Sequence, residues 1–198
     1  MIKVIAFDFG GVLGPDVDDW NHTFKEINRL TDLTSNHLQS IFEKYWPRLK
    51  LGKETMKQFW TKVSKISKRS VKPEILRRKY NEAIWINNEL LEIIKQLKEK
   101  YKVIMIANDS DDDYFVKTSR LKLNKFFDKL YCSSQLKISK PNRKIFKYVL
   151  KDQNIRSHKM LFVDNQKNNI KAAELLGIRT ILYENNFQLK TDIAKLFI

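Results

Sequence analysis

The stretch KVIAFDFGGVL at residues 3–13 decides the fold of this chain. Residues 4–7 form a short apolar run that ends in a carboxylate, Asp8, and two glycines, Gly10 and Gly11, follow closely. Such a run predicts a buried strand of a parallel sheet. An acid at its carboxyl end would lie where open α/β sheets bind ligands, and the glycines would allow the backbone to turn tightly there.

The same pattern returns twice further along the chain. The apolar run that begins at Lys102 ends in Asn108 and Asp109, and the run that begins at Lys159 ends in Asp164 and Asn165. Between these runs, Lys140 precedes a proline. Because parallel strands end at one edge of a sheet, the sequence predicts that a lysine and several oxygen-bearing side chains converge there.

Five short apolar segments are predicted strands, and helical patterns separate several of them. Alternation of this kind predicts an α/β fold, a three-layer, Rossmann-like parallel sheet with right-handed crossovers and helices on both faces. The predicted strands cover residues 3–8, 102–108, 129–133, 159–164 and 179–183.

Residues 16–86 interrupt the alternation, because they contain apolar residues at helical spacing and no convincing strand. We therefore expect a core of residues 1–15 and 87–198, with residues 16–86 inserted as a helical cap that covers the crevice. The cap helices are predicted at residues 18–30, 35–46, 54–67 and 72–86, with start signals at Asp18, Ser35 and Pro73 and a stop signal at Gly52. Most of its large aromatic residues are expected in the core of this bundle; they are Phe42, Trp46, Phe59, Trp60 and Trp85.

The composition fits one globular core, since 42% of the 198 residues are hydrophobic. The formal net charge is +15, from 38 basic and 23 acidic residues. This charge is consistent either with a polyanion-binding surface or with the codon usage of a genome rich in Lys, Asn and Ile codons. The basic residues are scattered along predicted helices, which favours solvated helix faces and disfavours a nucleic-acid partner. The positive field should still attract anionic ligands.

No apolar run is long enough to cross a membrane, and we see no signal peptide, so we expect a cytoplasmic protein without membrane contacts, either a monomer or a homodimer. The single cysteine, Cys132, excludes an internal disulfide and is expected in the core.

The residues at the predicted sheet edge suit phosphoryl transfer. Asp8 is either a nucleophile or a ligand for a hard cation. Oxygens of Gly10, Asp164 and Asn165, together with water, would complete a Mg²⁺ site. Lys140 would neutralise negative charge, and backbone amides of residues 9–12 would cradle phosphoryl oxygens.

The whole arrangement resembles the haloacid dehalogenase-like superfamily. FDFGGVL, IMIAND, CSSQLKISKPNRKIF and LFVDNQKNNIKAAELLGIRTILY are similar to its four motifs in order, and LGKETMKQFW is similar to a recurrent stretch of its helical caps. The nearest branch contains sugar-phosphate phosphatases and the phosphatase domain of epoxide hydrolases. The resemblance implies a Mg²⁺-dependent phosphatase that acts on a small phosphorylated metabolite through an aspartyl-phosphate intermediate.

The resemblance also implies a role for each candidate site residue. Asp8 would be the nucleophile and Lys140 the charge-neutralising lysine. The substrate phosphate would be bound by Gly11, Asn108 and Lys140, and the metal by Asp8, Gly10, Asp164 and Asn165.

Three positions depart from the family pattern. Gly10 stands where a second acid usually acts as general acid/base, so water or a nearby carboxylate (Asp16, Asp18 or Asp19) would have to move the proton, although these three read as a solvated loop and helix start. Ala107 replaces a small hydroxyl residue, and Asn165 replaces an acidic metal ligand.

These departures leave two other functions open. The first is a catalytically degenerate binding or regulatory protein, and the second is a carbon–halogen hydrolase, which uses the same aspartate without a metal. Other polar residues near the motifs have structural interpretations. Asp111, Asp112 and Asp113 read as a solvated helix start, and Asn168 and Asn169 as the start of the helix after the fourth strand.

Overall fold

The computed structural model describes the backbone of residues 1–16 and 20–196, and the side chains of residues 1–16 and 24–196. Its centre is a five-stranded sheet in the order β3-β2-β1-β4-β5, and every neighbouring pair of strands is parallel. The strands are β1 (Val4–Phe7), β2 (Lys102–Ala107), β3 (Lys129–Cys132), β4 (Met160–Asp164) and β5 (Arg179–Leu182). The five predicted strands are confirmed within one residue at each end.

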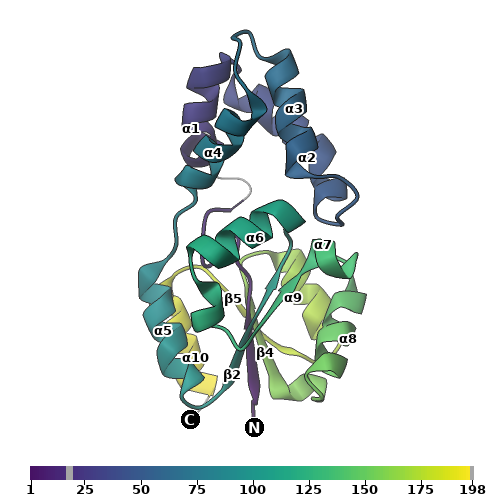
Figure 1. Cartoon of the computed structure of the whole chain (residues 1–198). Helices are drawn as coiled ribbons and strands as arrows, with labels where there is room; N and C mark the ends of the chain where they lie inside the picture. Colours follow the sequence, from purple (N-terminus) through teal and green to yellow (C-terminus); the bar gives the residue numbers. More distant parts are fainter. Residues whose placement is uncertain (17–19, 197–198) are drawn as a thin grey trace.

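Helices cover both faces of this sheet (Figure 1). Side chains of α5 (Asn88–Lys98) and α10 (Asn186–Leu196) pack in one apolar cluster with Ile5 and Phe7, whereas α8 (Arg143–Asp152) and α9 (Lys167–Glu174) pack with Val4 and Ala6 on the other face. Because β1 is buried on both faces, its sequence is continuously apolar rather than alternating. The predicted three-layer α/β fold is confirmed.

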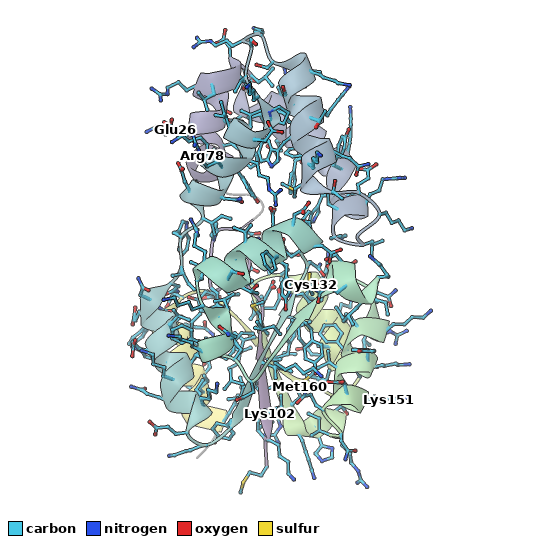
Figure 2. All side chains as sticks on the ribbon, in the orientation of Figure 1. Glu26, Arg78, Lys102, Cys132, Lys151 and Met160 are labelled. Atoms are coloured by element: carbon cyan, nitrogen blue, oxygen red, sulfur yellow. The ribbon has the colours of Figure 1, made fainter. Side chains whose placement is uncertain are left out.

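The carboxyl ends of the strands point toward the cap. In Figure 2, Lys102 and Met160, the first residues of β2 and β4, lie at the far end of the sheet, whereas Cys132, the last residue of β3, lies nearer to the cap. Cys132 is buried, as expected. Two further helices, α6 (Asp111–Arg120) and α7 (Ser133–Leu136), follow strand ends on this side, and the single turns η1 (Leu123–Lys125) and η2 (Ser157–Lys159) complete the core.

The cap consists of α1 (Trp20–Thr31), α2 (Ser35–Leu49), α3 (Met56–Ile66) and α4 (Pro73–Ala83), and it stands above the strand ends (Figure 1). Its interior is aromatic. The ring centroids of Phe59 and Trp60 are 4.7 Å apart, and those of Phe42 and Phe59 are 5.6 Å apart. Trp85 is the exception among the large aromatic residues of the cap, because α4 ends at Ala83, the backbone is extended at Ile84, and Trp85 is 43% exposed.

The predicted helix signals of the cap are met in part. Pro73 is the first residue of α4, as expected. Thr34 rather than Ser35 caps α2, since its hydroxyl accepts a hydrogen bond from the His37 amide. Gly52 lies beyond the end of α2, with φ at +61°, and Asp18 falls outside the described residues.

The loop between α2 and α3 docks the cap onto the core. The Ser133 hydroxyl donates to the Lys50 carbonyl at 2.6 Å, and the Met56 amide donates to the Asp112 carboxylate at 3.0 Å. A Cβ atom at Gly52 would lie 2.9 Å from the Ser134 carbonyl oxygen, and the φ of +61° also favours glycine at this contact. The cap is therefore held directly over the strand ends.

Within the described part of the chain, every helix is too short or too polar to cross a lipid bilayer.

Candidate active site

Asp8 follows β1 directly and lies beneath the cap. Its amide donates to the Val163 carbonyl at 2.9 Å, which continues the pairing of β1 with β4 by one residue. Its carboxylate is almost completely buried, and Oδ1 accepts a hydrogen bond from the Phe9 amide at 2.6 Å. The strand thus fixes both the place and the orientation of this acid.

Lys140 connects Asp8 with Asp164. Its Nζ lies 2.7 Å from Asp8 Oδ1 and 2.7 Å from Asp164 Oδ2, and its side chain has no exposed surface. The ammonium also lies 5.3 Å from the centroid of the Phe162 ring. Three segments that are far apart in the sequence therefore bring two acids and one lysine into a single buried cluster.

Burial and charge act against each other in this cluster. Burial raises the pKa of Asp8 to about 7, and the charge of Asp164 adds to this shift, while Lys140 opposes it. Burial alone would lower the pKa of Lys140, but the two carboxylates outweigh that effect and raise it. Lys140 therefore remains positively charged, whereas Asp8 is close to the balance between its two forms near neutral pH.

Both carboxylate oxygens of Asp164 are already occupied. Oδ1 accepts from the Gln166 amide at 2.8 Å and from Asn169 Nδ2 at 3.1 Å, and Oδ2 accepts from Lys140 and from Asn169 Nδ2 at 3.0 Å. These contacts favour Asp164 as the residue that orients Lys140, and its predicted role as a metal ligand stays a prediction.

Sequence reasoning missed the contribution of Asn169. It lies in the first turn of the helix after the fourth strand, as expected, but it is also 2% exposed and donates to both oxygens of Asp164. Its position in the first turn of the helix that follows the strand was the available signal, because that turn lies close to the end of the strand.

Asn108 positions the loop that carries Lys140. Its side-chain amide donates to the Lys140 carbonyl at 2.9 Å, and its Oδ1 accepts from the Lys140 amide at 2.9 Å. The following peptide bond, Lys140–Pro141, is cis. Asn108 also borders the cavity above Asp8. This place is compatible with the predicted contact between Asn108 and a substrate phosphate, which stays a prediction.

The hydroxyl that is missing at Ala107 is not supplied by Ser110. That side chain caps α6, because its oxygen accepts from the Asp113 amide at 3.2 Å. Asp113 itself is 2% exposed, so the expectation that it is solvated is wrong. The docked cap buries it.

Asp16 lies beside the position where the family has its second acid. A Cβ atom built on Gly10 would be 3.9 Å from Asp16 Oδ1, and Asp16 Oδ2 accepts from Asn165 Nδ2 at 2.6 Å. Asp16 therefore lies in a loop, as expected, but it is half-buried rather than fully solvated, whereas Asp18 and Asp19 lie outside the described residues.

Gly11 permits this arrangement. Its φ is +71°, and a Cβ atom there would lie 2.1 Å from Asn165 Nδ2. The loop amides largely serve the loop itself, since Gly11 donates to the Gly14 carbonyl and Val12 to the Phe9 carbonyl. The predicted binding of phosphate by Gly11 stays a prediction.

The oxygen atoms at this edge suit a hard cation such as Mg²⁺. Asn165 Oδ1 is buried and has no hydrogen-bond partner among the described residues, and Gly10 can offer its main-chain carbonyl. The described residues contain no cluster of three or more His, Cys, Asp or Glu side chains that could hold a metal. A bound Mg²⁺ would therefore need carbonyl and water oxygens, which it accepts readily.

A cavity of about 110 Å³ opens directly above Asp8, and we call it the nucleophile cavity. Lys140 and Asn108 border it from the core, and Trp46 and Lys50 border it from the cap. Burial lowers the pKa of Lys50, a residue that sequence reasoning did not single out. Two lysines therefore line the cavity together with the carboxylates of Asp8 and Asp16, so a small anionic group placed above Asp8 would find positive charge beside it.

Comparisons with known proteins show the family of the chain and several of its relatives. A family model described as haloacid dehalogenase-like hydrolase matches residues 5–183. The chain is 29% identical to D-ribitol-5-phosphate phosphatase from Bacteroides thetaiotaomicron, over 98% of both chains. It is similar to a haloacid dehalogenase-family enzyme from the same organism that was solved in complex with magnesium and inorganic phosphate, with a TM-score of 0.76, 26% identity and 94% and 96% of the two chains covered.

A third similarity concerns the fold alone. L-2-haloacid dehalogenase from Xanthobacter autotrophicus, solved with chloropropionic acid covalently bound, has a TM-score of 0.67 at 15% identity, over 98% of this chain and 83% of the other. The match of the family model to most of the sequence, on the fold and site described above, shows that the chain belongs to the haloacid dehalogenase-like hydrolase family.

Proposed function

We propose that this hydrolase is a Mg²⁺-dependent phosphatase that removes phosphate from a small phosphorylated metabolite, with Asp8 as the nucleophile. The observation that carries the proposal is the ammonium of Lys140, held 2.7 Å from Asp8 at the wall of the nucleophile cavity beneath the cap. The named activity of the D-ribitol-5-phosphate phosphatase supports the reaction class, and the magnesium and phosphate complex of the structural relative supports the cofactor.

In the proposed reaction, a carboxylate oxygen of Asp8 attacks the phosphorus, and the bond from phosphorus to the ester oxygen breaks. The electron pair goes to the leaving alcohol, which takes up a proton. Water then attacks the phosphorus of the aspartyl phosphate, so that phosphate is released and the Asp8 carboxylate is restored. Lys140 stabilises the negative charge in both steps, and the cap excludes bulk water.

The proton for the alcohol needs a donor, because Gly10 has no side chain. The carboxyl group of Asp16 lies beside Gly10 and is one candidate for the proton donor, and a water molecule is the other. Mg²⁺, held by Asp8, the Gly10 carbonyl and Asn165, would supply positive charge beside the phosphoryl oxygens when bound.

The test is hydrolysis of p-nitrophenyl phosphate with Mg²⁺ by the whole chain and by Asp8→Asn. We expect the substitution to lower kcat by about 10³-fold or more, because a carboxamide is a far weaker nucleophile. Asp192→Asn, an acid-to-amide change on α10, serves as the matched control and should retain full activity. Equal rates in the wild type and Asp8→Asn would contradict the assignment of the nucleophile.

The absence of a hydroxyl at Ala107 and of a second acid at Gly10 favours one other candidate, a protein that binds phosphate esters without turnover. In that case, calorimetry would detect binding of inorganic phosphate or an ester, while no ester would be hydrolysed. A carbon–halogen hydrolase is distinguished by activity on a 2-haloacid that survives removal of metal with a chelator.

A further inference from the structure

A second, smaller space lies between the cap and the core next to the nucleophile cavity. It encloses about 40 Å³, and we call it the distal cavity. The two cavities share Gly10, Asp16, Trp46 and Asn108 as wall residues. Because they share these walls, the alcohol part of an ester whose phosphate lies at Asp8 would extend toward the distal cavity.

A buried ion pair borders the distal cavity on the core side. Lys117 Nζ, from α6, lies 2.8 Å from Asp109 Oδ2, and the two side chains are only 13% and 4% exposed. Asp109 Oδ1 accepts from the Ser110 amide at 2.9 Å, and the Lys117 ammonium lies 5.1 Å from the centroid of the Phe9 ring. The proposed reaction uses neither charge.

An ion pair taken out of water is favourable only if further hydrogen bonds complete it. An ammonium group has three donors, and a carboxylate oxygen accepts more than one hydrogen bond. Asp109 takes one donor of Lys117. A ligand hydroxyl suits such a pair, because it accepts a hydrogen bond from the ammonium and donates one to the carboxylate.

The charge of the surroundings decides which ligands fit. A second buried carboxyl group, Asp113, acts on Lys117 and also contributes to the raised pKa of Tyr80 of the cap. Two carboxyl groups therefore face one ammonium, which leaves no surplus positive charge for another anionic group. The rings of Phe24 and Tyr80, with centroids 5.5 Å apart, line the cap side and offer contact to carbon atoms.

We propose that Asp109 and Lys117 bind the alcohol part of the substrate, and that this alcohol is small, uncharged and polyhydroxylated, as in a sugar or polyol monophosphate. The inference rests on the proposed phosphatase function, and it names the class of substrate and the residues that select it.

The first test compares three esters with four carbon atoms each: erythritol 4-phosphate, butyl phosphate and 4-phosphoerythronate. We expect kcat/KM for erythritol 4-phosphate to exceed each of the other two by about tenfold or more, since butyl phosphate leaves the ion pair without hydroxyl partners and 4-phosphoerythronate brings a second anion. Equal values for erythritol 4-phosphate and butyl phosphate in the wild type would overturn the proposal.

The second test uses Lys117→Met and Asp109→Asn. Both should reduce the preference for erythritol 4-phosphate over butyl phosphate by about tenfold, mainly through KM. Lys147→Met, a matched change on the exposed side of α8, should leave the preference unchanged. A uniform loss on both esters in folded variants, verified by thermal unfolding, would mean that the ion pair is only structural and would overturn the proposal.

A binding measurement separates this inference from the proposed function. If the wild type hydrolyses none of these esters and not p-nitrophenyl phosphate, the phosphatase proposal fails. Calorimetry with Asp8→Asn then still tests the ion pair, with erythritol 4-phosphate expected to bind about tenfold more tightly than butyl phosphate. Equal affinities would overturn the inference on its own.

Discussion

The ammonium group of Lys140 lies between two buried carboxylates, so Lys140 should stabilise the fold as well as take part in the reaction. We expect Lys140→Met to lower the free energy of unfolding by about 3–5 kcal/mol at about pH 8, because Asp8 and Asp164 would stay buried without a counter-charge. At about pH 5 the loss should be smaller, since Asp8, with its raised pKa, takes up a proton there. Urea unfolding at the two pH values measures the difference, and equal losses would contradict it.

Ala107 marks the place where the family has a small hydroxyl residue at the end of β2. We predict that Ala107→Ser increases kcat/KM for p-nitrophenyl phosphate by about 10- to 100-fold, because a donor to a phosphoryl oxygen is worth about this much in comparable sites. Steady-state kinetics checks the prediction. Ala172→Ser, on α9, is the matched control and should not change the rate. An unchanged rate in Ala107→Ser would show that a hydroxyl at position 107 does not reach the phosphate.

At the scale of elements, α6 of the core meets α4 of the cap at Asp113 and Tyr80. Burial raises the pKa of Asp113 to about 7, with further contributions from Asp109 and Asp112 that Lys117 and Arg77 oppose. The folded state therefore holds a proton on Asp113 at pH values where the unfolded chain has lost it. Between about pH 4 and 7, this residue makes the fold less stable as the pH rises.

The predicted consequence is that Asp113→Asn raises the melting temperature at about pH 8 and raises it less at about pH 3, where the acid is largely neutral in both states. Thermal unfolding at the two pH values provides the measurement. Asp128→Asn, a substitution at a partly exposed acid outside α6, controls for a general effect of removing one negative charge. A stabilisation that does not depend on pH would contradict the raised pKa.

The sequence predicts the strands and the cap helices well, because their signals are local. The strands are continuous apolar runs, and Asp8, Asn108 and Asp164 mark their ends. What the sequence does not reveal is burial that arises from contacts between distant segments. Asp113 and Asn169 look like ordinary helix starts until the cap and β4 pack against them, and Asp16 looks solvated until Asn165 approaches it.

For the whole molecule, the net charge of +15 acts at long range on anionic substrates. We expect kcat/KM for p-nitrophenyl phosphate to fall severalfold between about 20 and 500 mM salt with kcat nearly constant, because salt screens the encounter and not the buried site. Kinetics at a constant Mg²⁺ concentration measures this. Thermal unfolding at the same salt concentrations would show any effect of salt on the protein itself, and a fall in kcat alone would contradict the explanation.

The two connections between cap and core lie side by side. The Asn87 amide donates to the Leu13 carbonyl at 2.8 Å, and a Cβ atom at Gly14 would lie 3.1 Å from the Trp85 carbonyl. The two connections of the helical insertion therefore leave and re-enter the core next to each other. A short turn from Leu13 to Asn87 would close the chain of the core without moving a strand, so a chain shortened in this way would show whether the sheet folds without its insertion.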